Sequence, residues 1–448
     1  IGPADPRTRC ELLLSLGEAQ STGDRRSAKQ TFLDAAEIAR RLGLPHELAR
    51  AAVGYGGRIP WERAGSDHVL VPLLEEALDA LPDDEVELRA RLLSRLAGAL
   101  RDEPTRERRE RLSTEAVELA RRTENPIALA YALTGRGPAI LAPDTVAEFR
   151  AVAEELCEVG REIGDLERII HGHLDRFIAE VLVGEAGAAE ADLEVVARTA
   201  GELGQQVQLW QATAAQALLL LARGQSAAEQ VVVRTLEYGE RAQPDMAIPI
   251  YRLQRYALHD LHGGVDEVEA GLRDLVERYP ARRVLGCAVV RLEAQLGRTD
   301  EARAGLAEMT RDGLATLPFD QEWLYATSLL AEAAWTVEDL DSAEILYRSL
   351  EPWADLNAVD HPEGFRGSVS RYLGMLAAMF ERWDDAAAHF DEALAMNERM
   401  GALPWLAHTE RDYGRMLLAG GGAGARTRAR ELLDRADATY RGLGTAPS

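Results

Sequence analysis

Lysine is almost absent from this sequence. Of the 51 basic residues only Lys29 is a lysine, and all the others are arginines. A phosphate-binding loop of the G-x-x-x-x-G-K-[ST] kind needs a lysine after a glycine turn, and Lys29 has no such turn before it. A Schiff-base lysine needs a desolvated pocket, whereas Lys29 lies in a polar stretch close to Arg25 and Arg26. The sequence therefore excludes this nucleotide loop and disfavours lysine-based covalent catalysis.

Cysteines and long apolar runs are also scarce. Cys10, Cys157 and Cys287 form no CxxC pair, and an odd number does not describe a disulfide framework, so we expect a reducing, cytoplasmic setting. Apolar runs such as residues 217–222 are far below the ~20 residues that span a bilayer. The first residues lack the pattern of a signal peptide. Because the chain begins at Ile1, we expect it to be a piece of a longer protein.

Positive charge is in deficit. The chain carries 75 acidic and 51 basic residues, a formal net charge of −24. This balance disfavours direct binding to nucleic acid or to an anionic membrane, since both depend on clustered positive charge. Hydrophobic residues make up 46% of the chain and charged residues 28%, which is typical of a folded protein and not of a disordered one.

The dominant pattern that remains is the amphipathic helix. Apolar residues recur at three- and four-residue spacing along almost the whole chain, interrupted by short turns that contain Gly, Pro, Asp or Thr. Alternation of β-branched with polar residues, the pattern of a half-buried strand, is absent. The sequence therefore predicts an all-α protein of helical hairpins joined by tight turns.

A repeat of about 34 residues organises these helices. In the clearest unit, residues 367–400, Gly374 lies where the first helix packs closely, and Ala386 and Phe390 lie on the second helix. This spacing resembles the tetratricopeptide repeat and predicts a right-handed tetratricopeptide-like α-α superhelix of ~10 to 12 units. We expect a single solenoid over residues 1–448, with irregular hairpins in about 45–165, regular repeats in about 166–442 and a tail at 443–448.

The candidate binding surface is the concave groove of this superhelix. In the tetratricopeptide register, inward positions of the first helix of each repeat combine aromatic residues with arginine, which is typical of recognition surfaces. Aromatic residues at helical spacing also fill cores, so a core role remains the alternative for each position. The predicted groove residues are His171, Gln211, Tyr325, Glu332, Trp335, Arg371, Met375, His408, Arg411 and Arg415.

Other motifs give weaker signals. His171 and His173 point about 200° apart on a helix, and His259 with His262 would need a further ligand for zinc, so no metal site is predicted. The glycine-rich segment 420–424 follows a helix, not a strand, and is interpreted as the loop of the last repeat. Paired carboxylates fit helix starts or solvated faces. With no catalytic motif evident and no cofactor predicted, we expect a chain that is not an enzyme.

Several blocks of the sequence share one recognisable pattern. They are residues 10–20, 32–43, 48–57, 73–78, 88–97, 370–377 and 404–407. Together these blocks resemble the C-terminal helical-repeat region of large actinobacterial regulators. In that family an AAA-type or signal-transduction ATPase module precedes the repeats, and a nucleotide cyclase or a LuxR-type DNA-binding domain can be attached.

The resemblance implies a sensor or interaction arm that binds a small-molecule effector or a protein partner and controls the upstream ATPase module of the same polypeptide. Two alternatives stay open. A general tetratricopeptide scaffold would bind a peptide or protein in its groove. A helical enzyme would need a closed pocket with converging titratable groups.

Overall fold

The computed structural model describes residues 5–21, 25–57, 67–103, 105–420 and 424–445, and shows an all-helical solenoid with one small sheet. Among the described helices none is both long and apolar enough to cross a membrane. The first helices are α1 (Pro6–Gln20), α2 (Arg25–Leu42), α3 (Pro45–Tyr55), α4 (Leu70–Ala80), α5 (Val86–Ala99), α6 (Glu107–Arg122), α7 (Pro126–Ile140) and α8 (Val146–Ile163), with 3-10 turns η1 (Leu100–Asp102) and η2 (Pro143–Thr145).

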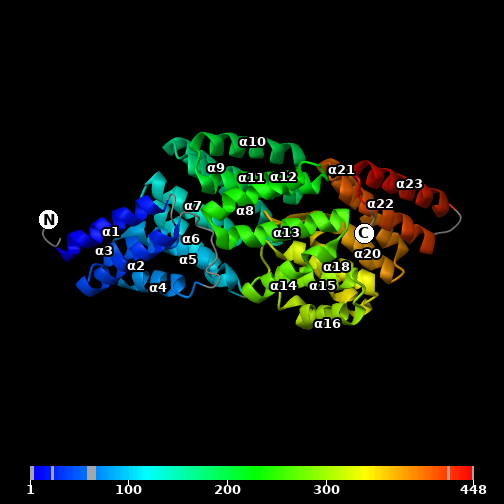
Figure 1. Ribbon diagram of the computed structural model, residues 1–448, viewed down its shortest axis with the longest axis horizontal. Helices are drawn as coiled ribbons and strands as arrows, with labels where there is room; N and C mark the ends of the chain where they lie inside the picture. Colours follow the sequence, from blue (N-terminus) through cyan, green and yellow to red (C-terminus); the bar gives the residue numbers. More distant parts are fainter. Residues whose placement is uncertain (1–4, 22–24, 58–66, 104, 421–423, 446–448) are drawn as a thin grey trace.

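The remaining elements form the larger part of the solenoid (Figure 1). They are α9 (Leu166–Val183), α10 (Ala186–Leu203), α11 (Gln206–Ala222), α12 (Ala228–Ala242), α13 (Pro244–His262), η3 (Val265–Val268), α14 (Glu269–Arg278), α15 (Arg283–Gln295), α16 (Thr299–Met309), α17 (Arg311–Leu314), α18 (Trp323–Val337), α19 (Leu340–Leu350), η4 (Glu351–Trp353), β1 (Asn357–Asp360), β2 (Gly364–Ser368), α20 (Val369–Met379), α21 (Trp383–Met400), α22 (Leu403–Gly420) and α23 (Ala425–Leu443).

Small residues set the distance between paired helices, as the repeat pattern predicts. A Cβ added at Gly374 of α20 would lie 3.0 Å from the ring of Phe390 on α21. Gly17 of α1 has the same relation to Phe32 of α2, where the added Cβ would lie 2.8 Å from the ring. The aromatic ring therefore fills the space that the missing side chain leaves, and interiors packed at this density tolerate little change in volume.

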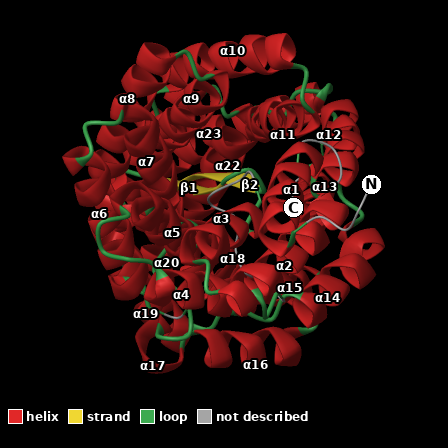
Figure 2. Cartoon of the chain, turned by 90° about the vertical axis from the view of Figure 1, so that its left-hand side faces the viewer, coloured by secondary structure: helices red, strands yellow, loops and turns green. Residues whose placement is uncertain are grey.

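Inner and outer helices differ in burial. Helices α9, α11, α18, α20 and α22 bury most of their residues, whereas their partners α10, α12, α19, α21 and α23 bury a narrower stripe and expose the rest. Viewed along the long axis, the helices surround a central region (Figure 2). The apolar core has two large clusters, one between Cys10 and Val159 and one between Ile140 and Leu432, which both include residues of α7 and α8.

The later repeats close on the earlier ones. Arg399 Nε of α21 donates to the carbonyl of Gly184, which follows α9, at 3.0 Å. Asn357 Nδ2 donates to the carbonyl of Val181 at 2.8 Å across 176 residues of sequence. The space where a Cβ of Gly224 would project is filled by Pro404 of α22. The segment from α9 to α22 therefore surrounds its own interior instead of presenting an open groove along its length.

A buried β-hairpin, which the sequence did not predict, fills that interior of a fold that is otherwise all-α as expected. β1 and β2 pair antiparallel, and every residue of both strands is buried. The hairpin lies at the centre of the ring of helices (Figure 2). It contacts the surrounding helices α9, α11, α13, α18, α20, α21 and α22. No residue alternation marks it in the sequence because both of its faces are covered, and alternation arises only when one face meets water.

Ser368 joins the hairpin to the helix that follows. It ends β2, and its side chain accepts a hydrogen bond from the backbone N–H of Ser370, so it caps the N-terminus of α20. Its own N–H donates to Asn397 Oδ1 at 3.1 Å. The strand β2 and the helix α20 are therefore fixed to each other and to α21.

The closure of the array makes a specific prediction about two glycines with the same backbone conformation. Gly184 ends α9 with φ +82° and Gly204 ends α10 with φ +66°. A Cβ at Gly204 would meet no atom of the described residues within 4 Å, whereas a Cβ at Gly184 would collide with Met396 and Arg399 of α21. We expect Gly204→Ala to cost about 1 kcal/mol through backbone strain and Gly184→Ala to cost about 1–3 kcal/mol more. Urea unfolding measures both, and equal costs would contradict this closure.

Candidate functional site

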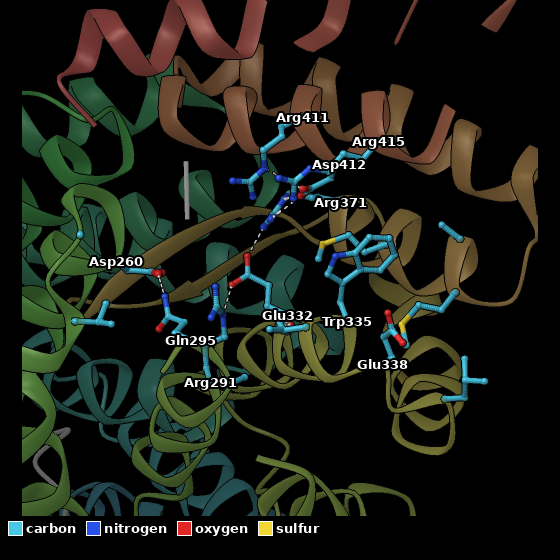
Figure 3. A pocket seen from close by; sticks show the side chains of 18 of the residues that line it. Asp260, Arg291, Gln295, Glu332, Trp335, Glu338, Arg371, Arg411, Asp412 and Arg415 are labelled. Carbon is cyan, nitrogen blue, oxygen red and sulfur yellow. Dashed lines mark hydrogen bonds and ion pairs between the residues drawn. The ribbon is translucent and has the colours of Figure 1, made fainter. Parts of the chain in front are cut away.

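A cavity of about 920 Å³ opens between five helices of the later repeats (Figure 3). We call it the inner cavity. Its walls come from inward-facing positions of α13, α15, α18, α20 and α22, with the segment after α13 and the start of α19 at its edges. The lining residues are His259, Asp260, Gly263, Val265, Arg291, Ala294, Gln295, Glu332, Trp335, Thr336, Glu338, Leu340, Arg371, Met375, Ala378, Met379, Arg411, Asp412 and Arg415.

Glu332 of α18 is the centre of the polar wall. Its Oε2 accepts from Arg291 Nε at 2.8 Å and also from Arg366 of β2, and its Oε1 accepts from Arg371 Nη1 at 2.5 Å. All four side chains are buried. Burial would raise the pKa of Glu332, but Arg366, Arg371 and Arg291 outweigh it and hold that pKa well below its usual value. Glu332 therefore stays ionised at neutral pH.

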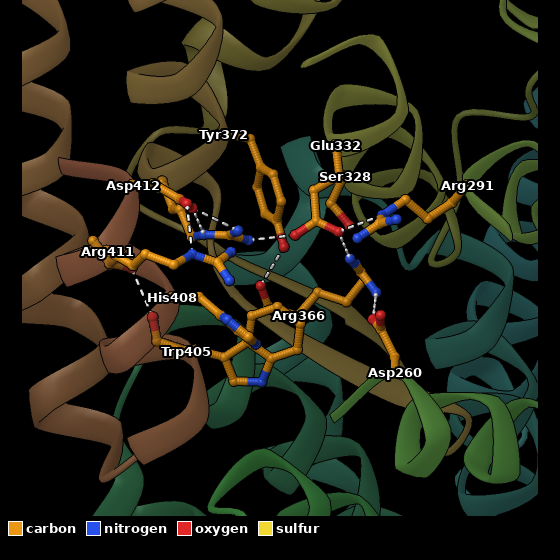
Figure 4. Close-up of polar contacts among 12 residues, drawn as sticks. Asp260, Arg291, Ser328, Glu332, Arg366, Tyr372, Trp405, His408, Arg411 and Asp412 are labelled. Atoms are coloured by element: carbon orange, nitrogen blue, oxygen red, sulfur yellow. Dashed lines mark hydrogen bonds and ion pairs between the residues drawn. The ribbon is translucent and has the colours of Figure 1, made fainter. Parts of the chain in front are cut away.

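The ion pairs continue to both sides of Glu332 (Figure 4). Arg371 donates from Nε and Nη2 to Asp412 Oδ2 of α22 at 3.0 and 2.7 Å, and Arg411 Nε lies 3.3 Å from Asp412 Oδ1. On the other side Arg366 Nη1 donates to Asp260 Oδ2 of α13 at 3.1 Å. We call this set, from Asp260 through Glu332 to Asp412, the ion-pair network.

Gln295 extends this polar surface along α15. It donates from Nε2 to Asp260 Oδ1 at 2.5 Å and accepts from the hydroxyl of Tyr256 at 3.1 Å. Burial raises the pKa of Tyr256 well above its usual value, aided by the charge of Asp260. Its hydroxyl therefore stays protonated and acts as a donor. The polar wall presents fixed charges and oriented donors, which suits binding.

Arg415 differs from the other arginines of the cavity. It is exposed, one helical turn beyond Arg411 on α22, and forms no hydrogen bond or ion pair with any residue that the structure describes. Beside the polar wall, about one helical turn farther along α18 and α20, the apolar surface is formed by Trp335, Met375 and Met379, with Leu340 at its edge. Trp335 is only partly buried and faces the cavity (Figure 3). The cavity therefore combines a charged wall, an arginine without a partner and an aromatic surface.

The structure distributes the ten predicted groove residues over three places, all on inner helices. Tyr325 is buried against Gly364 of the hairpin, and His408 Nδ1 lies 2.7 Å from the Tyr440 hydroxyl, so these two line neither cavity. Two others line a second, smaller cavity. The six in the inner cavity are Glu332, Trp335, Arg371, Met375, Arg411 and Arg415, and the two in the second cavity are His171 and Gln211.

Sequence reasoning missed several residues of this site. Asp260, Arg291 and Gln295 lie on α13 and α15, whose inward positions could have been found by applying the same helical register to those repeats. Arg366 lies in the hairpin, where the repeat register does not apply. Asp412 follows the predicted Arg411 directly, but its role depends on Arg371, which is 41 residues away in sequence.

The histidines make separate contacts. His173 Nδ1 lies 2.6 Å from Asp192 Oδ1 of α10, while His171 faces the second cavity. His259 Nε2 lies 2.9 Å from a guanidinium nitrogen of Arg255 on the same helix. Within the described ranges, no group of three or more His, Cys, Asp or Glu residues could hold a metal ion.

The side chain of the only lysine forms an ion pair. Lys29 Nζ lies 2.7 Å from Asp67 Oδ2 and 5.0 Å from the centre of the Tyr55 ring. Cys10, Cys157 and Cys287 are free and buried, and burial raises the pKa of Cys157 and of Cys287 to about 12. Of the glycine-rich segment 420–424, residues 421–423 lie outside the described residues.

Comparisons with known proteins identify no family for this chain. No family model matches the chain, and no curated protein is significantly similar to it. One solved structure, titled "Circular tandem repeat protein with novel repeat topology and enhanced subunit contact surfaces", matches with 16% identity over 97% of this chain and 98% of that chain. Its TM-score is 0.16, so this similarity decides nothing about the fold or the function of this chain.

The ion-pair network predicts a large cost for removing its central carboxylate. Glu332→Gln removes the negative charge that three buried guanidinium groups share, and we expect a loss of about 3–5 kcal/mol of unfolding free energy at pH 7. Glu338→Gln is the matched control, because Glu338 follows the same helix and is exposed, and we expect a change within about 0.5 kcal/mol. Chemical unfolding of both variants measures the difference.

The same variant tests the electrostatic origin of the effect. A carboxylate whose folded pKa lies below its unfolded value of 4.5 stabilises the fold above that pH and loses this contribution as the pH falls. The stability difference between the wild type and Glu332→Gln should therefore narrow below about pH 4.5. A difference that is constant with pH would show that Glu332 acts through packing alone.

Proposed function

We propose that this chain is a recognition region whose inner cavity binds an effector that carries an anionic group next to an apolar part. We further propose that this binding regulates an ATPase module elsewhere in the same polypeptide. The observation that carries the first proposal is that one cavity of about 920 Å³ contains both Arg415, which has no partner among the described residues, and the partly exposed ring of Trp335. A cavity of this size accommodates a ligand of drug or cofactor dimensions.

The charge of the cavity supports an anionic group. The lining residues carry four guanidinium groups and four carboxylates, and Arg366, which contacts Glu332 from behind the wall, adds a fifth positive charge in a chain whose net charge is −24. The carboxylates Glu332 and Asp412 are already held by arginines, so Arg415 remains to take a carboxylate or phosphate group, with which a guanidinium forms two parallel hydrogen bonds. The groups counted are Arg291, Arg366, Arg371, Arg411 and Arg415 against Asp260, Glu332, Glu338 and Asp412.

The apolar wall supports an aromatic or aliphatic part beside that anion. Met375 and Met379 lie one helical turn apart on α20 and face the same space as Trp335. Methionine side chains adapt to irregular ligand shapes, and tryptophan contributes a large contact area at low cost in conformational entropy. An effector with a planar apolar body would occupy this wall while its charged group meets Arg415.

The regulatory part of the proposal draws on the resemblance to bacterial ATPase regulators and on the physics of solenoids. The walls of the inner cavity come from α13, α15, α18, α20 and α22, which span more than 150 residues of sequence. A ligand that bridges these helices favours one spacing between repeats, and small rotations per repeat add up along an array. Helical-repeat arrays are also typical scaffolds for protein partners, so a peptide that ends in a carboxylate belongs to the same ligand chemistry.

A titration with 1-anilinonaphthalene-8-sulfonate tests the ligand class, because this dye joins a sulfonate to aromatic rings. We expect Arg415→Ala to raise its Kd roughly 10-fold or more, since a charge-assisted hydrogen bond contributes about 1.5–3 kcal/mol. Trp335→Ala should weaken binding as well. Arg348→Ala on the outer helix α19, where the side chain is 76% exposed, is the matched control and should leave the Kd unchanged.

Equal dye affinity in the wild type, Arg415→Ala and Trp335→Ala would refute the proposed site. Native mass spectrometry of the purified chain then identifies any effector retained from the expression host, with Arg415→Ala as the comparison. The regulatory step is tested in the longer polypeptide, where Arg415→Ala should keep basal ATPase activity and lose the response to that effector. If Arg415→Ala still responds to the effector, binding in the inner cavity does not regulate the ATPase.

A further inference from the structure

A second cavity lies at the turn of the β-hairpin, and we call it the hairpin cavity. It is enclosed by α9 and α11, by Phe149 of α8 and by His361 and Pro362 between the two strands. Its volume is about 50 Å³. One ordered water needs about 10–15 Å³ of cavity volume. The cavity therefore holds about four waters, or one molecule of about four non-hydrogen atoms. None of its lining residues belongs to the inner cavity.

Gln211 supplies an unused hydrogen-bonding group to this cavity. Its side chain is 5% exposed, and neither its Oε1 nor its Nε2 has a hydrogen-bond partner among the residues that the structure describes. A buried amide without partners is costly, because it has given up its bonds to water. The amide offers one acceptor and two donors to whatever occupies the cavity.

Asp175 of α9 is the second polar group of the cavity. It is buried and forms no hydrogen bond or ion pair with another described residue. Burial raises its pKa to about 8, although Arg101, which also lines the cavity, opposes that shift. At neutral pH its carboxyl group is therefore mostly protonated and offers one donor and one acceptor.

The remaining walls combine polar and apolar groups. His361 contributes a ring whose Nδ1 has no partner within the described chain, and burial lowers the pKa of His361 to about 3, so the ring is neutral. The ring of Trp210 and the side chains of Leu174 and Ile178 form the apolar part, and the other polar lining residues are Arg101, His171 and Gln321. The protonated carboxyl and the amide thus provide donor–acceptor pairs beside an apolar surface.

We propose that the hairpin cavity binds a small uncharged primary amide or urea-type group through Gln211 and Asp175. Such a group is planar, has about four non-hydrogen atoms, and carries adjacent donors and acceptors that match a carboxyl group and an amide. Ordered water is the alternative occupant. With about four atoms the ligand alone binds no more tightly than tens of micromolar.

Acetamide is the probe, and saturation-transfer difference NMR together with the thermal unfolding midpoint reports its binding to the whole chain. Acetone is the matched ligand, because it has the same number of non-hydrogen atoms and lacks donors. We expect saturation transfer to acetamide and a dose-dependent rise in the midpoint, with at least a 10-fold weaker response to acetone. An equal response to both, or no response to acetamide, would overturn the proposal and leave water as the occupant.

Two leucine variants of α11 separate the site from general stability. Gln211→Leu removes the unpartnered amide, so it should fold with an unchanged or higher unfolding midpoint and lose the acetamide signal. Gln208→Leu replaces another buried glutamine of α11 that does not line the cavity, and it should bind acetamide as the wild type does. Acetamide binding that survives Gln211→Leu would place the probe elsewhere. Arg415→Ala should not alter acetamide binding, which keeps this test independent of the inner cavity.

Discussion

Glu332 holds three arginines at once, and the arrangement of the later repeats depends on this carboxylate. Arg291 comes from α15, Arg366 from β2 and Arg371 from α20, so a single side chain of α18 connects four elements. Burying a charge is costly, and that cost is recovered only when the partners have good geometry. The positions of the elements are therefore coupled, because moving any one of them leaves a buried charge without its partner.

The hairpin explains why this network lies inside a solenoid and not on its surface. A helical array of this curvature leaves an interior that helices cannot fill, and β1 and β2 occupy it with nearly every backbone group covered. Arg366 reaches Asp260 and Glu332 from the hairpin and lies 5.2 Å from the ring centre of Trp405. The hairpin therefore connects α13, α18 and α22, and it fixes the walls of the inner cavity before any ligand arrives. Such preorganisation lowers the entropic cost of binding.

The repeat-level features of this fold could be predicted from the sequence because they are local. Gly374 and Phe390 are 16 residues apart, and the contact between them follows from helix periodicity and the size of the residues. The same register places all ten predicted groove residues on inner helices. It could not tell which of them would face a cavity, because Tyr325 and His408 are covered by residues of other elements, Gly364 and Tyr440.

The hairpin could not be predicted because its signal is entirely tertiary. Its strands contain Asn357, Asp360 and Arg366, which look like loop residues until their partners are known. Arg366 pairs with Asp260, which is 106 residues away, and Asn357 pairs with Val181, which is 176 residues away. A local sequence pattern does not reveal such contacts, because the group that pairs with each buried polar side chain lies far away in the sequence.

The hairpin lines one cavity directly and supports the other from behind its wall. Arg366 supports the polar wall of the inner cavity through Glu332, while His361 and Pro362 close the hairpin cavity. The two ends are held on different helices, because Gln254 Nε2 of α13 donates to the carbonyl of Pro362 at 2.8 Å and the Tyr372 hydroxyl of α20 donates to the carbonyl of Arg366. The turn at His361 and Pro362 can therefore move only if β2 moves with it or if one of these buried hydrogen bonds breaks. The predicted groove residues that line a cavity are thus divided between two cavities next to the hairpin, six in the inner cavity and two in the hairpin cavity.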